Sequence, residues 1–285
     1  MNSAVTIREP RGEALPLIFD SPHSGADYPA DFGTVLPLSV LREGEDRFVD
    51  ELFARAPDHG ALLLVASFPR AYVDPNREPD DIDPDLLAAP WPTPLRPSAA
   101  TAEGVGLIWR LVPPDRALYD RRLAPAEVEA RITRYWRPYR EALASALDRA
   151  RVRHGAVWHV NCHSMWSVGL DSGPDPGHRR KDICLSDRDG RSCDPGFIAC
   201  ARDALLERGY SVSINDPFKG GAIVARHGRP EDGYHSLQIE IVRGLYMDER
   251  TLEPHAGFER LRNDLGHLAE RLAAHVRASL QGAGG

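Results

Sequence analysis

Two short histidine-containing motifs stand out because each comes at the end of an apolar run. The first is SPHSG at residues 21–25 and the second is NCHS at residues 161–164. An imidazole on a short loop restrained by proline and small residues suits zinc, so His23 and His163 are candidate metal ligands. Each could instead be an ordinary histidine of a surface loop. His159, inside the second apolar run, is predicted to pack in the core.

An acidic residue could complete such a site. Apolar residues between positions 49 and 56 follow the i, i+3, i+4, i+7 spacing of one helical face, which predicts a helix over residues 46–56. Asp46 lies in its first turn and borders the buried face, about 60° from Val49 at 100° per residue. It could simply favour the helix dipole. It could instead join the histidines, because two histidines, one carboxylate and an open position for water are typical of hydrolytic zinc.

Glu240 is a carboxylate inside a predicted buried strand, residues 236–242. The leucine and isoleucines of this strand alternate with Gln238 and Glu240, so the two polar side chains share the opposite face. An ionised glutamate buried in a sheet is costly unless it is paired or functional. The preferred interpretation is a general base beside a metal-bound water, as amide hydrolysis requires. The alternative is a structural ion pair with an arginine.

Cationic residues occur in two further motifs. RAYVDPNR begins at Arg70, and the planar fork of arginine matches carboxylates, so Asn76 and Arg77 could hold an anionic substrate while Arg70 stabilises a developing oxyanion. The alternative is a surface turn formed by its DPN residues. The motif FKGG lacks the pattern of a nucleotide-binding loop, but its Lys219 could still meet an anionic group.

The cysteines do not indicate chemistry of their own. Cys162 and His163 are neighbours on a predicted strand, where successive side chains point to opposite faces, so a Cys–His dyad is disfavoured. The four cysteines form no C-x-x-C pair and no regular disulfide spacing. A reducing cytoplasm is the simplest location for such a chain, and its start lacks the features of a secretory signal.

The elements that must position these side chains alternate along the chain. Short apolar segments bounded by turn formers predict five buried strands, at residues 15–21, 61–67, 156–161, 211–215 and 236–242. Further helices are predicted at residues 125–154, with a kink or break at Pro138, and at 195–208 and 251–280. This alternation predicts one α/β domain over residues 1–285, with a mostly parallel sheet covered on both faces and ligands at the carboxyl ends of its strands.

Two segments do not fit this alternation. Residues 78–102 contain six prolines, too many for a helix or a paired strand, and predict a long irregular loop that could cover the site. Residues 281–285 predict a disordered tail.

Composition excludes several classes of protein. The 285 residues include 35 Lys and Arg against 42 Asp and Glu, and the net charge of −7 argues against a general nucleic-acid binder. Apolar residues make up 42%, enough for a sizeable core. The longest apolar run, residues 61–66, is far shorter than the roughly 18 residues of a membrane span. We therefore expect neither a nucleic-acid nor a membrane partner, and the oligomeric state is left open.

Taken in order, the motifs resemble the N-formylglutamate amidohydrolase family, which is related to zinc carboxypeptidases and aspartoacylases. The resemblance spans about residues 12–275 and rests on SPHSG, the segment at Asp46, DPNR, CHS, NDPFKGG and HSLQIEIVRGLYMDE. It implies a three-layer α/β/α fold with a mostly parallel mixed sheet, of the phosphorylase/hydrolase-like or zinc exopeptidase-like type.

The resemblance also implies a role for each candidate residue. One zinc ion per chain is expected, with the ligands His23, Asp46 and His163. Carboxypeptidase relatives carry their acidic ligand where this chain has Ala26, so Glu45 and Asp50 compete with Asp46 for that role. Glu240 corresponds to the general acid/base. The residues expected to polarise or hold the substrate are Arg70, Asn76, Arg77 and Lys219.

The reaction that these roles imply is metal-dependent hydrolysis of a small anionic N-acyl amino acid. The simplest case is N-formyl-L-glutamate giving formate and L-glutamate, a step of histidine degradation. One alternative is a related acyl-amino-acid amidohydrolase or carboxypeptidase with another substrate. The other is a non-catalytic binding protein whose histidines are incidental. Iron, cobalt or manganese can also occupy sites of histidine and carboxylate.

Overall fold

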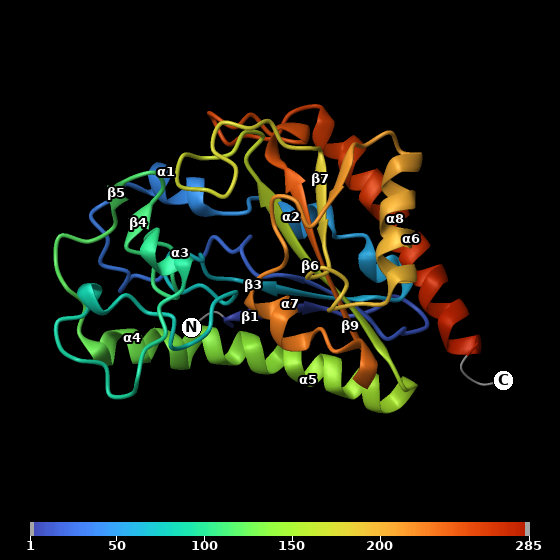
Figure 1. The fold of residues 1–285 in the computed structure, drawn as a ribbon, viewed down its shortest axis with the longest axis horizontal. Helices are drawn as coiled ribbons and strands as arrows, with labels where there is room; N and C mark the ends of the chain where they lie inside the picture. The colour runs from blue at the N-terminus through green and yellow to red at the C-terminus, as the bar shows by residue number, and fades with distance from the viewer. Residues whose placement is uncertain (1–2, 283–285) are drawn as a thin grey trace.

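A seven-stranded mixed sheet forms the centre of the molecule in the computed structural model, which describes residues 3–282 (Figure 1). The strand order is β1-β3-β2-β6-β9-β7-β8. Strands β3, β2, β6 and β9 run parallel, whereas β1 and β7 pair antiparallel with β3 and β9. The strands of this sheet are β1 (Val5–Arg8), β2 (Leu17–Ser21), β3 (Leu62–Ala66), β6 (Val157–Met165), β7 (Ile183–Ser186), β8 (Val212–Ile214) and β9 (Tyr234–Val242); β4 (Leu111–Val112) and β5 (Arg116–Ala117) form a separate pair.

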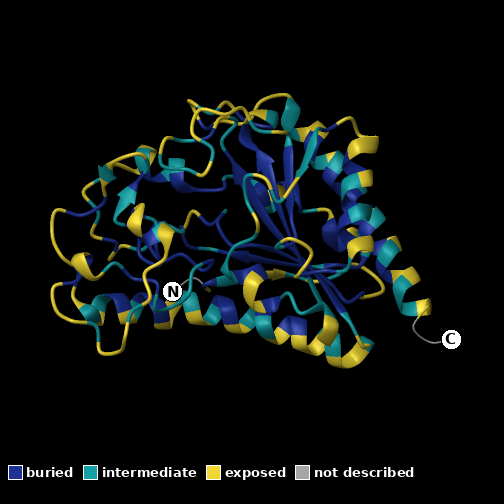
Figure 2. Cartoon of the chain, in the orientation of Figure 1, coloured by how far each residue is buried: buried dark blue, intermediate teal, exposed yellow. Residues whose placement is uncertain are grey.

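Helices cover both faces of the sheet. Helices α2, α6 and α8 share one apolar cluster with one face, and α4, α5 and α7 share a second cluster with the other. Figure 2 shows the buried strands between helices that expose their outer sides. These layers confirm the predicted α/β/α arrangement with a mostly parallel mixed sheet. The helices are α1 (Leu38–Leu41), α2 (Val49–Leu52), α3 (Ala99–Ala102), α4 (Pro125–Arg131), α5 (Arg137–His154), α6 (Pro195–Glu207), α7 (Ala222–His227) and α8 (Gly257–Gly282).

All five predicted strands are present, although their ends differ from the prediction. The largest difference is in β6, which continues to Met165, so that His163 lies inside the strand rather than after it. The sequence pattern misses β1 and β7, of four residues each, and the two-residue strands β4 and β5. Cys162 and His163 point to opposite faces as predicted, since Cys162 packs in the cluster on the α2, α6 and α8 side.

The prediction of a continuous helix over residues 46–56 is wrong. Phe48 has a left-handed backbone (φ 65°), so α2 begins only at Val49 and makes a single turn. A 3-10 turn, Ala56–His59, follows it. The apolar residues of this segment are spaced so that their side chains are buried under α8. An irregular chain can bury the same side chains, so the spacing does not require a helix.

Two other helices differ in detail from the prediction. A π-helical turn, Ile132–Trp136, joins α4 to α5, with the N–H of Arg137 bonded to the carbonyl of Ile132. This wider turn lies directly before Pro138. A regular α-helical turn would clash with the proline ring and would lack the N–H that proline does not have. Helix α8 begins at Gly257 rather than at residue 251 and includes residues 281 and 282, so that part of the predicted tail is helical. Residues 283–285 lie outside the described residues.

The proline-rich segment folds against the body of the protein. It contains a 3-10 turn, Pro84–Leu86, and the single turn of α3 after its last proline. The buried Asp81 carboxylate accepts hydrogen bonds from the backbone N–H and hydroxyl of Ser98, at 2.7 and 2.8 Å. The expectation that residues 78–102 cover the site is wrong, because the main cavity is lined instead by the segment that follows, residues 103–116.

No helix within residues 3–282 has both the length and the apolar character of a membrane span.

Candidate functional site

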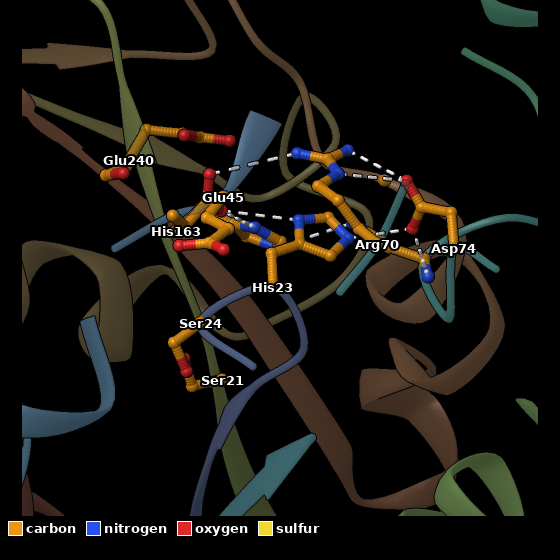
Figure 3. A network of polar contacts seen from close by, with 12 residues as sticks. Ser21, His23, Ser24, Glu45, Arg70, Asp74, His163 and Glu240 are labelled. Atoms are coloured by element: carbon orange, nitrogen blue, oxygen red, sulfur yellow. Dashed lines mark hydrogen bonds and ion pairs between the residues drawn. The ribbon is translucent and has the colours of Figure 1, made fainter. Parts of the chain in front are cut away.

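His23 and His163 come from neighbouring parallel strands and face each other. His23 follows β2 in a turn that packs tightly on the chain after β3: a Cβ atom at Gly25 would lie 2.5 Å from the carbonyl oxygen of Phe68. His163 lies near the carboxyl end of β6. Both side chains are buried, and their ring centroids are 4.7 Å apart. Both motifs therefore meet at the carboxyl edge of the sheet, as the sequence predicts (Figure 3).

Asp46 lies between the two histidines. Its Oδ2 is 3.3 Å from Nδ1 of His23 and 3.0 Å from Nδ1 of His163. The backbone N–H of Asp46 donates to the carbonyl of His23, at 3.0 Å. Because Asp46 precedes α2, this backbone contact, rather than helical periodicity, aims its carboxylate inwards. Burial opposes ionisation of Asp46, but its contacts with His163 and His23 and the nearby charge of Arg70 hold its pKa well below the usual range.

The two competing acidic residues point elsewhere. Glu45 accepts a hydrogen bond from the hydroxyl of Tyr28 at 2.6 Å and pairs with Arg47 at 3.2 Å. Asp50 pairs with Arg8 at 2.7 Å, away from the histidines. Of the three acidic candidates, Asp46 is the one that the structure places against both rings.

The far side of each imidazole ring has a hydrogen-bond acceptor. Nε2 of His23 lies 2.7 Å from Oδ1 of Asp74, and Nε2 of His163 lies 2.7 Å from Oδ1 of Asn161. Metal-binding histidines usually donate their second N–H in this way, which fixes the tautomer and turns the other nitrogen to the metal. With a metal bound, these acceptors would hold a proton on both Nε2 atoms and leave both Nδ1 atoms free to coordinate.

This donor set fits a cation. Burial lowers the pKa of His163, so its ring is neutral, with the Nε2 proton directed at Asn161. Its Nδ1 lone pair then faces a carboxylate oxygen of Asp46 only 3.0 Å away, and the two repel unless a cation lies between them. The ligand atoms of His23, Asp46 and His163 lie within 4.8 Å of one another. Two imidazole nitrogens and a carboxylate oxygen at this separation suit a first-row metal such as zinc.

Arg70 and Asp74 form a second charged pair beside this group. Arg70 donates from Nε and Nη2 to Oδ2 of Asp74, at 3.1 and 2.9 Å, and its Nη1 lies 3.8 Å from Oδ1 of Asp46. Its guanidinium stacks over the ring of Trp109, which lies in the cavity wall. Burial opposes ionisation of Asp74 as well, but the charge of Arg70 holds the pKa of Asp74 well below its usual range. The pair keeps a positive charge next to Asp46.

Glu240 lies on β9 directly opposite His163 in the parallel register. It shares a face with Gln238, as predicted, and Nε2 of Gln238 donates to its Oε1 at 3.0 Å. Gln238 is held in turn by the backbone N–H of Gly221, at 2.8 Å. Burial and the nearby charge of Asp46 raise the pKa of Glu240 well above its usual range. Figure 3 shows its carboxylate pointing towards Arg70, so it can act as a base in the same cavity.

A cavity of about 720 Å³ opens over these residues and includes the predicted substrate-binding side chains. Asn76 receives a hydrogen bond on Oδ1 from the N–H of Ile223, at 2.9 Å. Its Nδ2 lies 3.3 Å from Nε2 of His163. When that Nε2 carries a proton it cannot accept a hydrogen bond, so the amide protons of Asn76 remain available to a ligand. Arg77 donates to the carbonyls of Val105 and Asn76, and within residues 3–282 it forms no ion pair. Burial lowers the pKa of Arg77.

Lys219 is less well placed than Arg77. It lies at the edge of the cavity, 63% of its side chain is exposed, and its Nζ pairs with Asp189 at 3.1 Å. The glycines after it have a clear structural role. A Cβ atom at Gly221 would lie 2.5 Å from Nδ2 of Asn76, so a larger residue there would displace the amide.

Sequence reasoning missed two residues of the site. Asp74 was expected only as part of a turn, yet it is fully buried and joins His23 to Arg70. Arg243 donates to the carbonyl of Glu45 at 2.5 Å and to Oδ1 of Asp46 at 3.3 Å, and so supports the acidic residue from behind. The available signal for Arg243 was its position directly after an apolar strand, where ligand-binding residues of α/β sheets gather.

The fold and the site define an α/β protein with a buried histidine–carboxylate group at the carboxyl edge of its sheet and an arginine-lined cavity above it. The sequence profile of N-formylglutamate amidohydrolase matches residues 15–247. N-formylglutamate deformylase from Pseudomonas aeruginosa is 32% identical over 244 residues, which cover 83% of this chain and 84% of that protein. The enzyme of the same name from Pseudomonas putida is 33% identical over 243 residues, or 82% and 83% of the two chains.

The crystal structure of N-formylglutamate amidohydrolase from Ralstonia eutropha JMP134 superposes with a TM-score of 0.92. Sequence identity to it is 48%, and the alignment covers 98% of this chain and 100% of that one. The chain therefore belongs to the N-formylglutamate amidohydrolase family, as its motifs predict.

Proposed function

We propose that this protein hydrolyses N-formyl-L-glutamate to formate and L-glutamate, with one zinc ion held by His23, Asp46 and His163. The substrate is supported by the names of the relatives, which are N-formylglutamate deformylases. The observation that carries the chemistry is the buried His–Asp–His group with Glu240 next to it in the register of the sheet. All four cysteines are free, which supports a reducing location such as the cytoplasm.

Zinc in such a site supplies a Lewis acid that brings the pKa of bound water towards about 7. Glu240 accepts the proton of the attacking water and later delivers it to the leaving amine. Its raised pKa suits both steps, because the group can hold a proton near neutral pH. Gln238 fixes the carboxylate in place by its hydrogen bond to Oε1.

Arg70 stabilises the negative charge that develops on the formyl oxygen. Its guanidinium is already oriented by Asp74 and Trp109, so little reorganisation is needed when charge appears. Arg77 binds a carboxylate of the substrate, because it is a half-buried cation with no carboxylate of its own to pair with in residues 3–282. Asn76 donates from its free amide to the same carboxylate, and Lys219 attracts the substrate at the rim of the cavity.

The test of this mechanism is Glu240→Gln, assayed for formate release. We expect turnover to fall by about 10²- to 10⁴-fold, the usual contribution of a general base, while the protein still binds one zinc ion. Glu45→Gln is the matched control, because Glu45 is also a buried glutamate but bonds to Tyr28 rather than facing the cavity. A wild-type rate in Glu240→Gln would remove this residue from the mechanism.

The substrate is tested separately with the wild-type protein. Formyl, acetyl and peptidyl derivatives of glutamate are compared at equal concentration, with zinc content measured in the same preparation. We expect the formyl compound to give the highest kcat/KM. Absence of deformylation in a zinc-loaded protein would exclude the proposed substrate, and absence of any bound transition metal would exclude the proposed cofactor.

A further inference from the structure

A second buried polar cluster lies in the sheet beneath the histidines, and the proposed mechanism does not use it. At its centre is Asp20 on β2, which is fully buried. Its Oδ1 accepts from Nδ2 of Asn161 at 2.7 Å and from Nε2 of His159 at 2.8 Å. Its Oδ2 accepts from the hydroxyl of Tyr139 on α5, at 2.7 Å. His159 is thus the core histidine that the sequence predicts, bonded on its other side to Ser236 at 2.8 Å.

The bond between Asp20 and Asn161 decides which way the Asn161 amide faces. A carboxylate can only accept hydrogen bonds, so the amino group of Asn161 must point to Asp20. The carbonyl Oδ1 of Asn161 must then point to His163, 2.7 Å from its Nε2. If the amide turned over, an amino group would face His163 and would favour the opposite tautomer of the ring.

A competing donor already lies near the same nitrogen. Nδ2 of Asn76 is 3.3 Å from Nε2 of His163, and it cannot turn away because its own Oδ1 is held by the N–H of Ile223. Asn76 alone would favour an unprotonated Nε2 and a proton on Nδ1, which would block coordination. An acceptor of fixed orientation is needed to place the proton on Nε2, and Asn161 supplies it only while Asp20 holds its amide.

We propose that Asp20 is a positioning residue for His163: by orienting Asn161 it keeps the His163 proton on Nε2 and leaves Nδ1 free for the metal. The inference rests on the proposed metal site and adds to it a residue two hydrogen bonds away from the ring. His23 is oriented directly, because its Nε2 contacts the carboxylate of Asp74. The two ligands are thus oriented by different devices, a carboxylate in one case and an amide backed by a carboxylate in the other.

The remaining bonds of the cluster give the carboxylate more than one support, so that losing a single one leaves Asp20 in place. Tyr139 and His159 donate to Asp20 from different elements, and Ser236 fixes the orientation of His159. A buried carboxylate with three donors keeps its charge. It therefore remains an acceptor towards Asn161.

Four variants separate positioning of His163 from simple support of the fold. Asp20→Asn and Asn161→Leu act on the path to His163. Tyr139→Phe and Ser236→Ala are the controls, since each removes one buried hydrogen bond of the same cluster without touching Asn161. For each, the zinc dissociation constant is measured by competition with a chelator, and the melting temperature is measured on the zinc-free protein.

We expect zinc binding to weaken by about 10-fold in Asp20→Asn and by about 10- to 100-fold in Asn161→Leu, the usual effect of losing an outer-shell partner. The two controls should lower the melting temperature of the zinc-free protein but keep the zinc dissociation constant of the wild type. The inference is overturned if Asp20→Asn and Asn161→Leu bind zinc as wild type does. It is also overturned if all four variants lose zinc affinity equally.

The tautomer itself is read from the ¹⁵N shifts of the His163 ring in zinc-free protein, assigned by their loss in His163→Gln. Asp46 attracts a proton to Nδ1 when no metal is bound, so the variants are compared with one another: we expect a larger Nε2-protonated fraction in the wild type and in Tyr139→Phe than in Asn161→Leu. An unchanged tautomer in Asn161→Leu would contradict the inference. Neither this readout nor the dissociation constant depends on the substrate, so failure to deformylate N-formylglutamate would leave the inference intact.

Discussion

Asp74→Asn is the substitution whose effects the structure defines most fully. The carboxylate of Asp74 orients His23 through Oδ1, at 2.7 Å, and Arg70 through Oδ2, at 2.9 and 3.1 Å. In the variant, one of these two partners must face an amide N–H₂ group, which can only donate. Either His23 loses the acceptor that fixes its tautomer, or Arg70 loses the partner that holds it over Trp109.

The size of the effect follows from the geometry. At a separation of 2.9 Å and an effective dielectric constant of about 20, the gross attraction between Arg70 and Asp74 is about 6 kcal/mol. Desolvation offsets part of it, and losing one member of a buried pair costs about 3–5 kcal/mol in the free energy of unfolding. Loss of an outer-shell carboxylate weakens metal binding by about 10- to 100-fold. We expect both losses in Asp74→Asn.

The assay is urea unfolding of the zinc-free protein together with zinc competition against a chelator. Asp50→Asn is the control, because Asp50 pairs with the part-exposed Arg8, and such pairs contribute only about 0–1 kcal/mol. The reasoning is refuted if Asp74→Asn matches Asp50→Asn in both measurements. A stable variant with normal zinc affinity would mean that Asp74 orients neither His23 nor Arg70.

Three further predictions follow from the same geometry. Because burial raises the pKa of Glu240, kcat/KM should fall as the pH drops through that raised value, and a profile that stays flat down to about pH 4.3 would exclude Glu240 as the base. Arg77→Met should raise KM more than it lowers kcat, and a pure kcat effect in steady-state kinetics would argue against a substrate carboxylate at this position. Gly221→Ala should weaken substrate binding by moving Asn76, which lies 2.5 Å from the added Cβ, and its zinc content should be normal; an unchanged KM would count against Asn76 as a substrate ligand.

Three of the residues that the sequence identified, His23, His163 and Glu240, lie on or next to regular strands. Alternation along β9 separates Glu240 from the apolar face, and the ends of the apolar runs mark His23 and His163. Within a strand the direction of a side chain depends only on local geometry, so spacing alone predicts it. The three-layer arrangement follows from the same strands, since a buried parallel sheet needs helices on both faces.

The residues that the sequence missed depend on distant contacts. Asp74 resembles part of a surface turn until the fold buries it between His23 and Arg70. Arg243 contacts the backbone of Glu45, 198 positions earlier in the chain. The prediction of a helix from Asp46 is wrong for a local reason. The left-handed backbone of Phe48 prevents a continuous helix there, although the apolar spacing of the segment is helical.

The pairing of β6 with β9 places His163 and Glu240 side by side through the backbone ladder of the sheet. The wall of the cavity comes from other parts of the chain, among them residues 103–116 and the loop that includes Leu170 and Pro174. The proposed ligand and the proposed base are fixed by strand register, so they keep their spacing when such loops change in length or sequence. If these two residues act as proposed, new substrate preferences could arise in this family, or be engineered, by exchanging wall segments while the sheet retains His163 and Glu240.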